Sequence, residues 1–515
     1  MVNHLPSDPA PTYGLQSARV SPLMVFVFLL GMVLLWTVLC GVSHRAPDLD
    51  GMEELVWAAS FELGYYKHPP FPSWILYGLT SIVGKPIWLV FLAGQLASAL
   101  ALWFVWRLGC EFTTPAKSFI AVLMVSTTAY FSLRGTIYNH NTAQLWSIVA
   151  CTWLLYRGLR YQKVSSWLWL GAVAALATMT KYSAVIQFAV FFVFLLVQGH
   201  LVQAQTWKGL AWALLAFVLV FSPHLYWLVG NDFLPFRYLD ASIEASTYAD
   251  VLKDILDFSL DQLGRISPMV VVWIGLYVWN RRRSAGLGAS YSSELSAWDR
   301  SFLLWVGLGP FVITVLAAAL LGTRLTASWA TTFFVLYGFF TFWWLRGSER
   351  INLRRTLILV VAVHVLMAVG YAVARGPLAY EAGRTSRSTF PGEQISSLMQ
   401  DVWRQHVPGT PLRLVASDTW FGGNVAVHVH PDTNVFIDAD YMQSPWLDPA
   451  TALDCGALVA YSEIKRGPPA DALKALHDTA RWKGQLTLPW SSTRSPDIVI
   501  EWGVIPPGPN CKVLP

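Results

Sequence analysis

Long apolar runs occupy most of the chain and limit its fold more than any other feature of the sequence. About eleven of them lie between residues 21 and 374, and several reach the roughly 20 residues that a helix needs to cross a bilayer. Only 13% of the 515 residues are charged, about half the share of an average soluble domain. The sequence therefore predicts a mainly α, polytopic membrane protein.

The predicted spans are 21–42, 86–108, 116–134, 142–159, 166–180, 183–199, 209–229, 266–280, 301–321, 326–345 and 356–374. The pair 166–180 and 183–199 is separated by almost no loop. The first run is long enough to span and lacks a clear small-residue cleavage site, so it is interpreted as a transmembrane helix and not as a signal peptide.

Lys and Arg are distributed unevenly over the loops between these runs. One set of loops is rich in them, for example Arg281, Arg282 and Arg283, and the positive-inside trend assigns this set to the cytoplasm. The N-terminal tail, 1–20, is then cytoplasmic, and the loop 43–85 and the tail 376–515 lie on the opposite, outer side of the membrane. Cations on that poorer side invite a functional hypothesis: Arg45, Lys67, Lys85, Arg134, Lys181, Arg237 and Arg324.

The tail 376–515 has a different composition from the predicted transmembrane domain, 21–375. Short β-branched runs predict strands at 411–417, 433–439, 455–461 and 496–502, and helices are predicted at 392–406 and 469–478. This alternation indicates a small α/β domain. Cys455 and Cys511 could pair there in an oxidising compartment, although their spacing alone does not decide it. Cys40, Cys110 and Cys151 lie in or beside apolar runs and are expected to be buried thiols.

The first outer loop is unusually acidic. If 50–60 is helical, Asp50, Glu53 and Glu54 share one face at i, i+3 and i+4, with Trp57 on the same side. Carboxylates this close repel one another unless a cation, a metal ion or a shared proton compensates, so a functional site is one interpretation. The other is a solvated interfacial helix whose acids are favoured by the helix dipole.

Four stretches of the chain resemble the GT-C class of polytopic glycosyltransferases. Within it, the chain is similar to bacterial members of glycosyltransferase family 39 and to the lipid A aminoarabinose transferases. The first-loop pattern is carried here by Asp50, Glu53, Trp57, Gly64, Tyr65, Tyr66, His68, Pro69 and Pro70. The other similar stretches are 138–146, 180–185 and 222–240. Many members have adjacent Asp and Glu in the loop where this chain has Met52 and Glu53, so the central carboxylate stays open: Asp50 first, Glu53 second, Asp48 third.

The resemblance implies transfer of a sugar from a polyprenyl-phosphate donor to a lipid or cell-envelope glycan acceptor at the outer face, with inversion at C1. A phosphate is already a good leaving group, so the site needs a base for an acceptor hydroxyl and cations for the phosphate. The predicted catalytic residues are Asp50 and Glu53. The predicted phosphate partners are Lys181, Lys67, Arg134 and Arg324, each of which could instead be an ordinary cation at the end of a span.

Sugar or acceptor contacts are predicted for His68, Tyr66, Trp57, Asn139, His140, Asn141 and His224. For the Asn residues a helix cap is the alternative, and for His224 a structural role. No cofactor is implied with certainty, and a divalent cation held by Asp48, Asp50 and Glu53 stays open. In the tail, His428, His430 and Asp432 form "HVHPD", where alternating His on a strand could bind a metal ion.

Several function classes do not fit. The sequence has no Walker-type loop and no Gly-rich dinucleotide fingerprint, and a net charge of +5 does not suggest a nucleic-acid partner. A polytopic transporter or flippase is the main alternative, although transporters place ionisable groups near the midplane and not at the outer ends of spans. A sensor domain on a membrane anchor would need far fewer spans.

Overall fold

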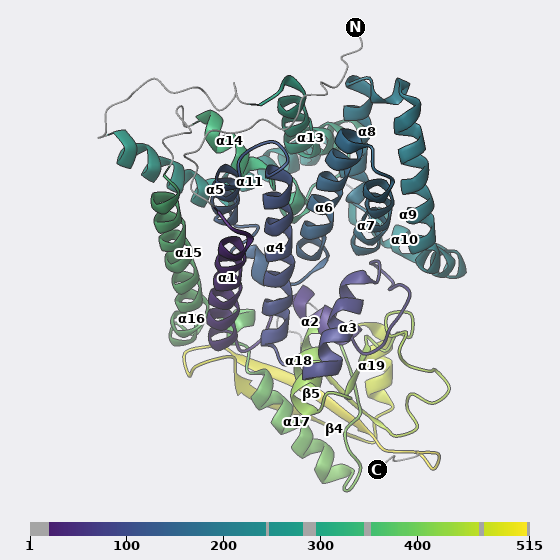
Figure 1. Cartoon of the computed structure of the whole chain (residues 1–515). Helices are drawn as coiled ribbons and strands as arrows, with labels where there is room; N and C mark the ends of the chain where they lie inside the picture. Colours follow the sequence, from purple (N-terminus) through teal and green to yellow (C-terminus); the bar gives the residue numbers. More distant parts are fainter. Residues whose placement is uncertain (1–19, 244–246, 282–294, 345–351, 463–467, 512–515) are drawn as a thin grey trace.

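The structure is a computed structural model that describes residues 20–243, 247–281, 295–344, 352–462 and 468–511. It has a large helical bundle and, at one end of it, a smaller unit of strands and helices (Figure 1). The helices α2 (Leu49–Trp57) and α3 (Phe71–Val83) lie between the two parts. The predicted first outer loop is therefore enclosed by structure on both sides.

The bundle contains twelve described helices that follow one another along the chain from residue 22 to residue 375. They are α1 (Pro22–Ser43), α4 (Trp88–Gly109), α5 (Pro115–Ser126), α6 (His140–Tyr161), α7 (Val164–Thr180), α8 (Ala184–Val197), α9 (Ala204–Gly230), α10 (Leu234–Ile243), α11 (Tyr248–Arg281), α13 (Ala297–Leu321), α14 (Tyr337–Trp344) and α15 (Leu353–Arg375). Short 3₁₀ turns, η1 (Arg134–Thr136) and η3 (Ala327–Thr332), interrupt them.

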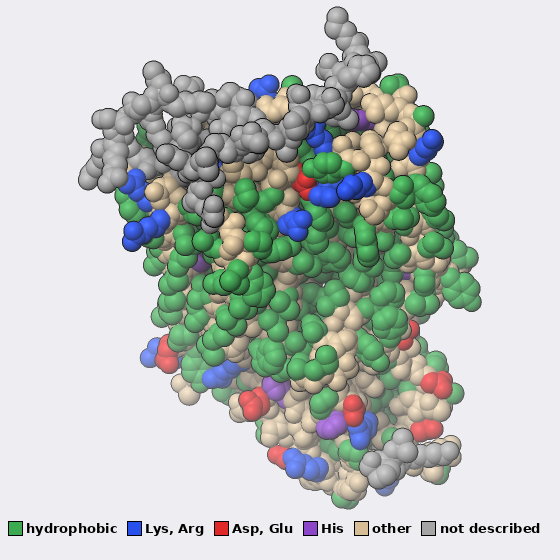
Figure 2. Space-filling model, in the orientation of Figure 1, with side chains coloured by type: hydrophobic (Ala, Val, Ile, Leu, Met, Phe, Trp, Pro, Cys, Tyr) green, Lys and Arg blue, Asp and Glu red, His purple; other side chains and the backbone are tan. Residues whose placement is uncertain are grey.

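Five described helical segments are long and apolar enough to cross a membrane: α1, α4, α9, α13 and the run 353–381. Four shorter apolar helices accompany them, α3, α5, α7 and α8. Figure 2 shows the corresponding broad hydrophobic band, with charged side chains gathered above and below it. The protein is thus a multi-pass membrane protein, and the count of eleven spans stays a prediction.

Three predicted spans differ from the observed helices. The run 116–134 stops being helical at Ser126, where the hydroxyls of Ser126, Thr127 and Thr128 each donate to a carbonyl three residues earlier, a local bond that competes with helix continuation. The run 326–345 is split into η3 and α14, and 266–280 is only the second half of α11. The helix α3 was not predicted, because its 13 residues are too few to span.

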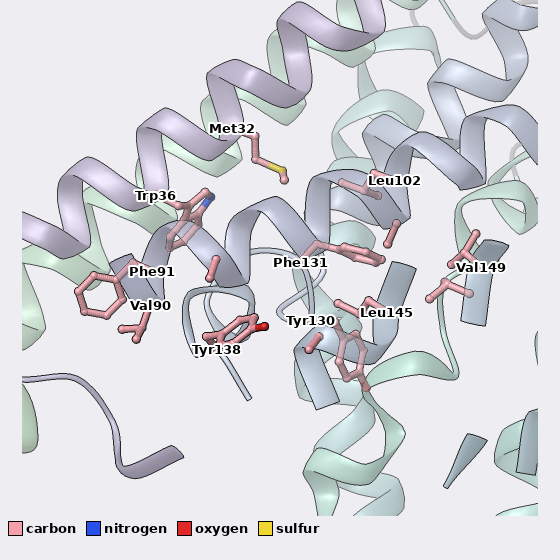
Figure 3. Close-up of a cluster of buried hydrophobic side chains, with 14 of the residues drawn as sticks. Met32, Trp36, Val90, Phe91, Leu102, Tyr130, Phe131, Tyr138, Leu145 and Val149 are labelled. Carbon is pink, nitrogen blue, oxygen red and sulfur yellow. The ribbon is translucent and has the colours of Figure 1, made fainter. Parts of the chain in front are cut away.

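The core of the bundle lies between α1, α4, α6 and the segment after α5 (Figure 3). Trp36, Phe131 and Tyr138 are almost completely buried there. The Tyr138 hydroxyl donates to the Pro72 carbonyl at 2.9 Å and so ties this core to α3. Lipid is as apolar as these side chains, so close packing and hydrogen bonds must supply much of the stability. Gly171 of α7 shows such packing, since a Cβ there would lie 1.9 Å from the Ala213 carbonyl oxygen of α9.

The C-terminal unit, residues 392–511, is built on a five-stranded mixed sheet of order β2-β1-β3-β5-β4. Its strands are β1 (Leu414–Ser417), β2 (Asn434–Ile437), β3 (Ala457–Tyr461), β4 (Trp482–Pro489) and β5 (Asp497–Ile505). Pairs β1–β2 and β1–β3 are parallel, whereas β3–β5 and β4–β5 are antiparallel. The helices are α17 (Gly392–His406), α18 (Thr419–Val429) and α19 (Asp471–Asp478). Four strands and two helices match predicted segments, and β4 and α18 were not predicted.

His428 and His430 do not lie on a strand, so the prediction that they alternate along one is wrong. His428 lies in the last turn of α18 and His430 is its C-cap, because Asp418 caps the helix by accepting from the N–H groups of Trp420 and Phe421. No group of three or more His, Cys, Asp or Glu side chains among the described residues could hold a metal ion. The predicted metal pair in this tail motif is therefore not supported.

A disulfide joins Cys455 to Cys511, which confirms the pairing that the sequence left open. It fastens the end of the chain beside β3, where the Gly508 N–H also donates to the Asp454 carbonyl at 2.7 Å. Cys40 and Cys151 are buried thiols and Cys110 is half-buried, as predicted.

Candidate active site

Helix α2 places three carboxylates between the bundle and the C-terminal unit. Its apolar side chains are buried against both parts, and a Cβ at Gly423 of α18 would lie 2.6 Å from Met52. Glu53 and Glu54 are buried with it, at 5% and 1% exposure, whereas Asp50 in the first turn is exposed. Buried carboxylates are costly unless they are paired, so the partners of each acid indicate its role.

Asp50 is held by an amide and not by a cation. The Asn139 side-chain amide donates to Asp50 Oδ2 at 2.9 Å, while Asn139 Oδ1 accepts from the Thr142 N–H and caps α6. Asn139 is therefore a helix cap that also contacts Asp50, and its role in the site stays a prediction. An exposed carboxylate oriented by a neutral donor is free to accept a proton from an incoming group.

Glu53 forms a short ion pair with Lys67, whose Nζ lies 2.5 Å from Glu53 Oε1. The ammonium also faces the rings of Trp57, Tyr66 and Tyr238 at 5.8, 5.5 and 5.9 Å from their centroids. Burial alone would lower the pKa of Lys67, but the adjacent Glu53 carboxylate raises it above its usual value. Lys67 is thus a fixed cation inside an aromatic enclosure.

Glu54 is bound on both of its oxygens. The Ser73 hydroxyl donates to Oε2 at 2.7 Å, and His140 Nδ1 lies 3.0 Å from Oε1. Burial raises the pKa of Glu54 to about 8, and the Ser73 hydrogen bond lowers it only partly. His140 Nε2 lies 3.3 Å from the Pro69 carbonyl, so the same imidazole contacts both the Glu54 carboxyl and the Pro-rich turn.

This contact orders the Pro-rich turn above the acids. The rings of His68 and His140 are in tilted contact, with centroids 4.1 Å apart and planes at 36°, and the Pro69 carbonyl lies 3.3 Å from His140 Nε2. Burial lowers the pKa of His68 well below its usual value, which favours the neutral ring. His68 and His140 therefore position the turn that carries Lys67.

Two basic residues, Lys181 and Arg134, lie in segments that contact the first turn of α6. Lys181 Nζ donates to Asn141 Oδ1 at 2.6 Å and lies 5.8 Å from the Trp329 ring centroid. Arg134 lies in η1, next to α6, where its carbonyl accepts from the Thr142 hydroxyl at 3.4 Å. These two cations and the Asn139–Asp50 pair share one end of one helix.

Arg265 of α11 belongs to the same region and was missed in the sequence. Its carbonyl accepts from the Ala129 N–H, and the Ala129 carbonyl in turn accepts from the Arg134 N–H. Its guanidinium lies 5.9 Å from the Tyr130 ring centroid, and its Nη2 lies 3.6 Å from Asp261 Oδ2. The buried Nη1 has no hydrogen bond among the described residues. The available signal was an Arg directly before the apolar run 266–280, on the cation-poor side.

Other predicted site residues have partners elsewhere. Arg324 is 58% exposed and pairs with Asp254 at 3.0 Å, and Asp48 faces Arg387 at 3.8 Å. His224 uses both nitrogens, since Nδ1 lies 2.7 Å from the Leu63 carbonyl and Nε2 lies 2.8 Å from the Tyr182 hydroxyl. His224 therefore ties α9 to the first outer loop.

The backbone at Gly64 makes the same connection to α9. A Cβ at Gly64 would lie 2.2 Å from the Trp227 ring, so only glycine lets the loop approach this helix so closely. The three acids proposed for a metal ion, Asp48, Asp50 and Glu53, each have a different partner, and they form no metal-type group among the described residues.

Known proteins similar to this chain are glycosyltransferases. A family model described as dolichyl-phosphate-mannose-protein mannosyltransferase matches residues 67–227. The lipopolysaccharide core galacturonosyltransferase RgtA of Rhizobium johnstonii is 22% identical over 77% of this chain and 78% of its own length. The lipid A galacturonosyltransferase RgtD of the same organism is 22% identical over 65% of this chain and 69% of its own.

Solved structures of ArnT from Cupriavidus metallidurans share the fold. The structure bound to undecaprenyl phosphate has a TM-score of 0.60 and 14% identity, and covers 93% of this chain and 98% of that one. The apo structure has a TM-score of 0.61 with the same identity. The chain is a glycosyltransferase with the fold of these ArnT structures. In this glycosyltransferase the matched family segment includes Lys67, Asn139 and Lys181, while Asp50 and Glu53 lie just before it.

Proposed function

We propose that this glycosyltransferase moves a sugar from a polyprenyl-phosphate donor to a lipid or cell-envelope glycan at the periplasmic face of the inner membrane. The observation that carries the proposal is Asp50, an exposed carboxylate that Asn139 orients beside fixed cations. The printed names of RgtA and RgtD, which act on lipopolysaccharide core and lipid A, favour an acceptor of this kind. The ArnT structure with undecaprenyl phosphate favours the donor.

The proposed reaction is a single displacement at C1 of the sugar. Asp50 accepts the proton of the acceptor hydroxyl, the acceptor oxygen bonds to C1, and the bond from C1 to the phosphate oxygen breaks. The electron pair leaves with the polyprenyl phosphate, and the configuration at C1 inverts. No group needs to protonate this leaving group, which distinguishes the site from a glycoside hydrolase with two catalytic carboxylates.

The phosphate needs positive charge at the moment it leaves. In this proposal Lys181, which is close enough to Asp50 to interact with its charge, supplies it together with Arg134 and Arg265, and the Nη1 of Arg265 can bind a phosphate oxygen directly. Lys67 is already neutralised by Glu53. Its role in this proposal is to hold the loop and, with the half-buried Tyr66, to form the wall against which a sugar ring lies. Trp57 is fully buried and contacts Tyr66 edge-on, so it supports this wall without facing the sugar.

The proposed orientation of the chain in the membrane rests on the distribution of Lys and Arg and on the disulfide. Lys and Arg are concentrated on the side assigned to the cytoplasm, and a disulfide in the C-terminal unit fits an oxidising periplasm. The domains proposed are a cytoplasmic tail at 1–20, a catalytic transmembrane domain at 21–375 and a periplasmic domain at 376–515.

The test compares envelope lipids and glycans from a deletion strain and its parent by mass spectrometry. The proposal predicts loss of one sugar from a glycolipid or glycan, restored by the wild-type gene and not by Asp50→Asn. An unchanged set of envelope glycans, together with altered export of a lipid or sugar, would favour the transporter alternative and contradict the proposal.

A further inference from the structure

A second polar pocket of about 250 Å³ lies between the first outer loop and the C-terminal unit. It is lined by Thr80 and Ser81 of α3, by Lys85 after this helix, and by Asp432 and Asn434 next to β2. None of the active-site residues described above lines it. Asp432 belongs to the "HVHPD" motif, which the proposed function does not use.

Lys85 is the basic residue that lines the pocket, and Asp432 is the acidic one. Lys85 is half-buried, and among the described residues its ammonium has no hydrogen bond and no carboxylate within 4 Å. Asp432 is the nearby acid, but its carboxylate is bound by Arg413 at 3.2 Å. Burial lowers the pKa of Lys85 and Asp432 only partly offsets this, which agrees with an ammonium that lacks a close counter-ion. A ligand with an anionic group would supply one.

The remaining lining groups are suited to sugar hydroxyls. The hydroxyls of Thr80 and Ser81 donate to the carbonyls of Tyr77 and Gly78 at 3.1 and 2.8 Å. Their oxygens therefore keep lone pairs that can accept from a ligand. The volume is below the roughly 300–1,000 Å³ of a drug-sized site, so the pocket fits one sugar unit and not an oligosaccharide.

The position of α3 sets the level of this pocket relative to the bilayer. Ile82 and Val83 at its end are 80% and 46% exposed, and Tyr77 is 38% exposed. Apolar side chains this exposed beside a membrane bundle belong in lipid, and an exposed tyrosine is typical of the interface. Thr80, Ser81 and Lys85 then lie at the level of lipid headgroups.

We propose that this pocket binds the anionic sugar headgroup of the glycolipid acceptor, with Lys85 as its charge contact. The proposal rests on the proposed function, because it places the acceptor's headgroup in a glycosyltransferase whose acceptor is a lipid. The C-terminal unit thereby acquires a role, since Asp432 and Asn434 complete a site that α3 alone leaves open.

The test measures lipid binding to the purified full-length protein in detergent by native mass spectrometry. The probes are bis-phosphorylated lipid A, the same lipid with both phosphates removed, and undecaprenyl phosphate. Lys85→Gln is expected to bind lipid A about tenfold more weakly, the size of a lost hydrogen bond to a charged group, and to bind the other two as the wild type does. Lys85→Arg keeps the charge and should retain binding.

Two further variants make the result specific. Lys474→Gln removes an exposed lysine from the same unit and should change nothing, whereas Ser81→Phe should block the pocket from its exposed rim. The proposal is overturned if Lys85→Gln or Ser81→Phe binds lipid A as tightly as the wild type, or if Lys474→Gln weakens binding equally. The binding measurement does not depend on turnover. A negative binding result would therefore not contradict the proposed sugar transfer, and an inactive enzyme could still be tested for binding.

Discussion

An ion pair on α2 is buried, whereas an ion pair in the C-terminal unit is exposed to solvent. In the Glu53–Lys67 pair the two side chains are only 7% and 14% exposed, whereas in the Asp401–Arg404 pair of α17 they are 65% and 67% exposed. An exposed pair contributes little, while a buried one carries a large desolvation cost that apolar residues would avoid. The contrast suggests that the α2 charges are kept for chemistry and not for stability.

Breaking the buried pair should have the largest effect. Lys67→Met leaves the Glu53 carboxylate buried and unpaired, so it is expected to lower the free energy of unfolding by about 3–5 kcal/mol and to abolish transfer. Thermal unfolding in detergent and a transfer assay measure the two effects. The double variant Glu53→Leu/Lys67→Met should recover most of the stability but not the activity; full recovery of both would show that the pair is only structural.

Arg265→Met tests whether the charge of this residue is needed for turnover or for stability. The guanidinium has a buried Nη1 without a hydrogen bond among the described residues and lies near Arg134. We expect turnover to fall about 10²-fold, the scale of losing one preorganised donor, with little change in the melting temperature. Arg324→Met, on an exposed cation paired with Asp254, is the control and should keep most of the activity. Equal losses in both variants would contradict the assignment.

Glu54→Gln should change how stability depends on pH. Because the folded-state pKa is raised from 4.5 to about 8, this group stabilises the fold fully below pH 4.5, and that stability is lost as pH rises toward 8. Gln is neutral throughout, so the variant should be less sensitive to pH over this window. If the melting temperatures of wild type and variant changed by the same amount between pH 5 and 8.5, the raised pKa of Glu54 would be contradicted.

The smallest effect is expected for the exposed pair. Arg404→Ala removes a surface ion pair within α17 and should change the free energy of unfolding by less than about 1 kcal/mol, with unchanged transfer. Chemical denaturation and the same transfer assay check it. A loss comparable to that of Lys67→Met would remove the contrast between the two regions.

Sequence reasoning located the site but not its pairings. Asp50, Glu53 and Glu54 follow helical spacing, and Asn139 to Asn141 begin a helix, so local rules were enough to place them. Which acid is exposed depends on packing between α2, α6 and α18, which local patterns do not contain. Lys67 was expected at the phosphate, yet a residue 14 positions earlier binds it.

The fold, too, was predicted only where the sequence pattern is local. Long apolar helices and β-branched strands were predicted because their patterns are local. Helix α18, with two glycines, and strand β4, with a half-buried glycine and an exposed proline, have weak propensities, and tertiary contacts stabilise them. Arg265 was missed for the same reason, because a tertiary backbone contact to Ala129 brings α11 beside η1.

The central claim is that Asp50 is the base of a sugar transfer from a polyprenyl phosphate. The direct measurement is turnover of the purified enzyme with a polyprenyl-phosphate sugar and a lipid A acceptor, compared with Asp50→Asn and, as matched control, Asp48→Asn. The account predicts a loss on the order of 10²–10⁴-fold for Asp50→Asn with its melting temperature kept, and near-normal turnover for Asp48→Asn. Wild-type turnover by Asp50→Asn would contradict it.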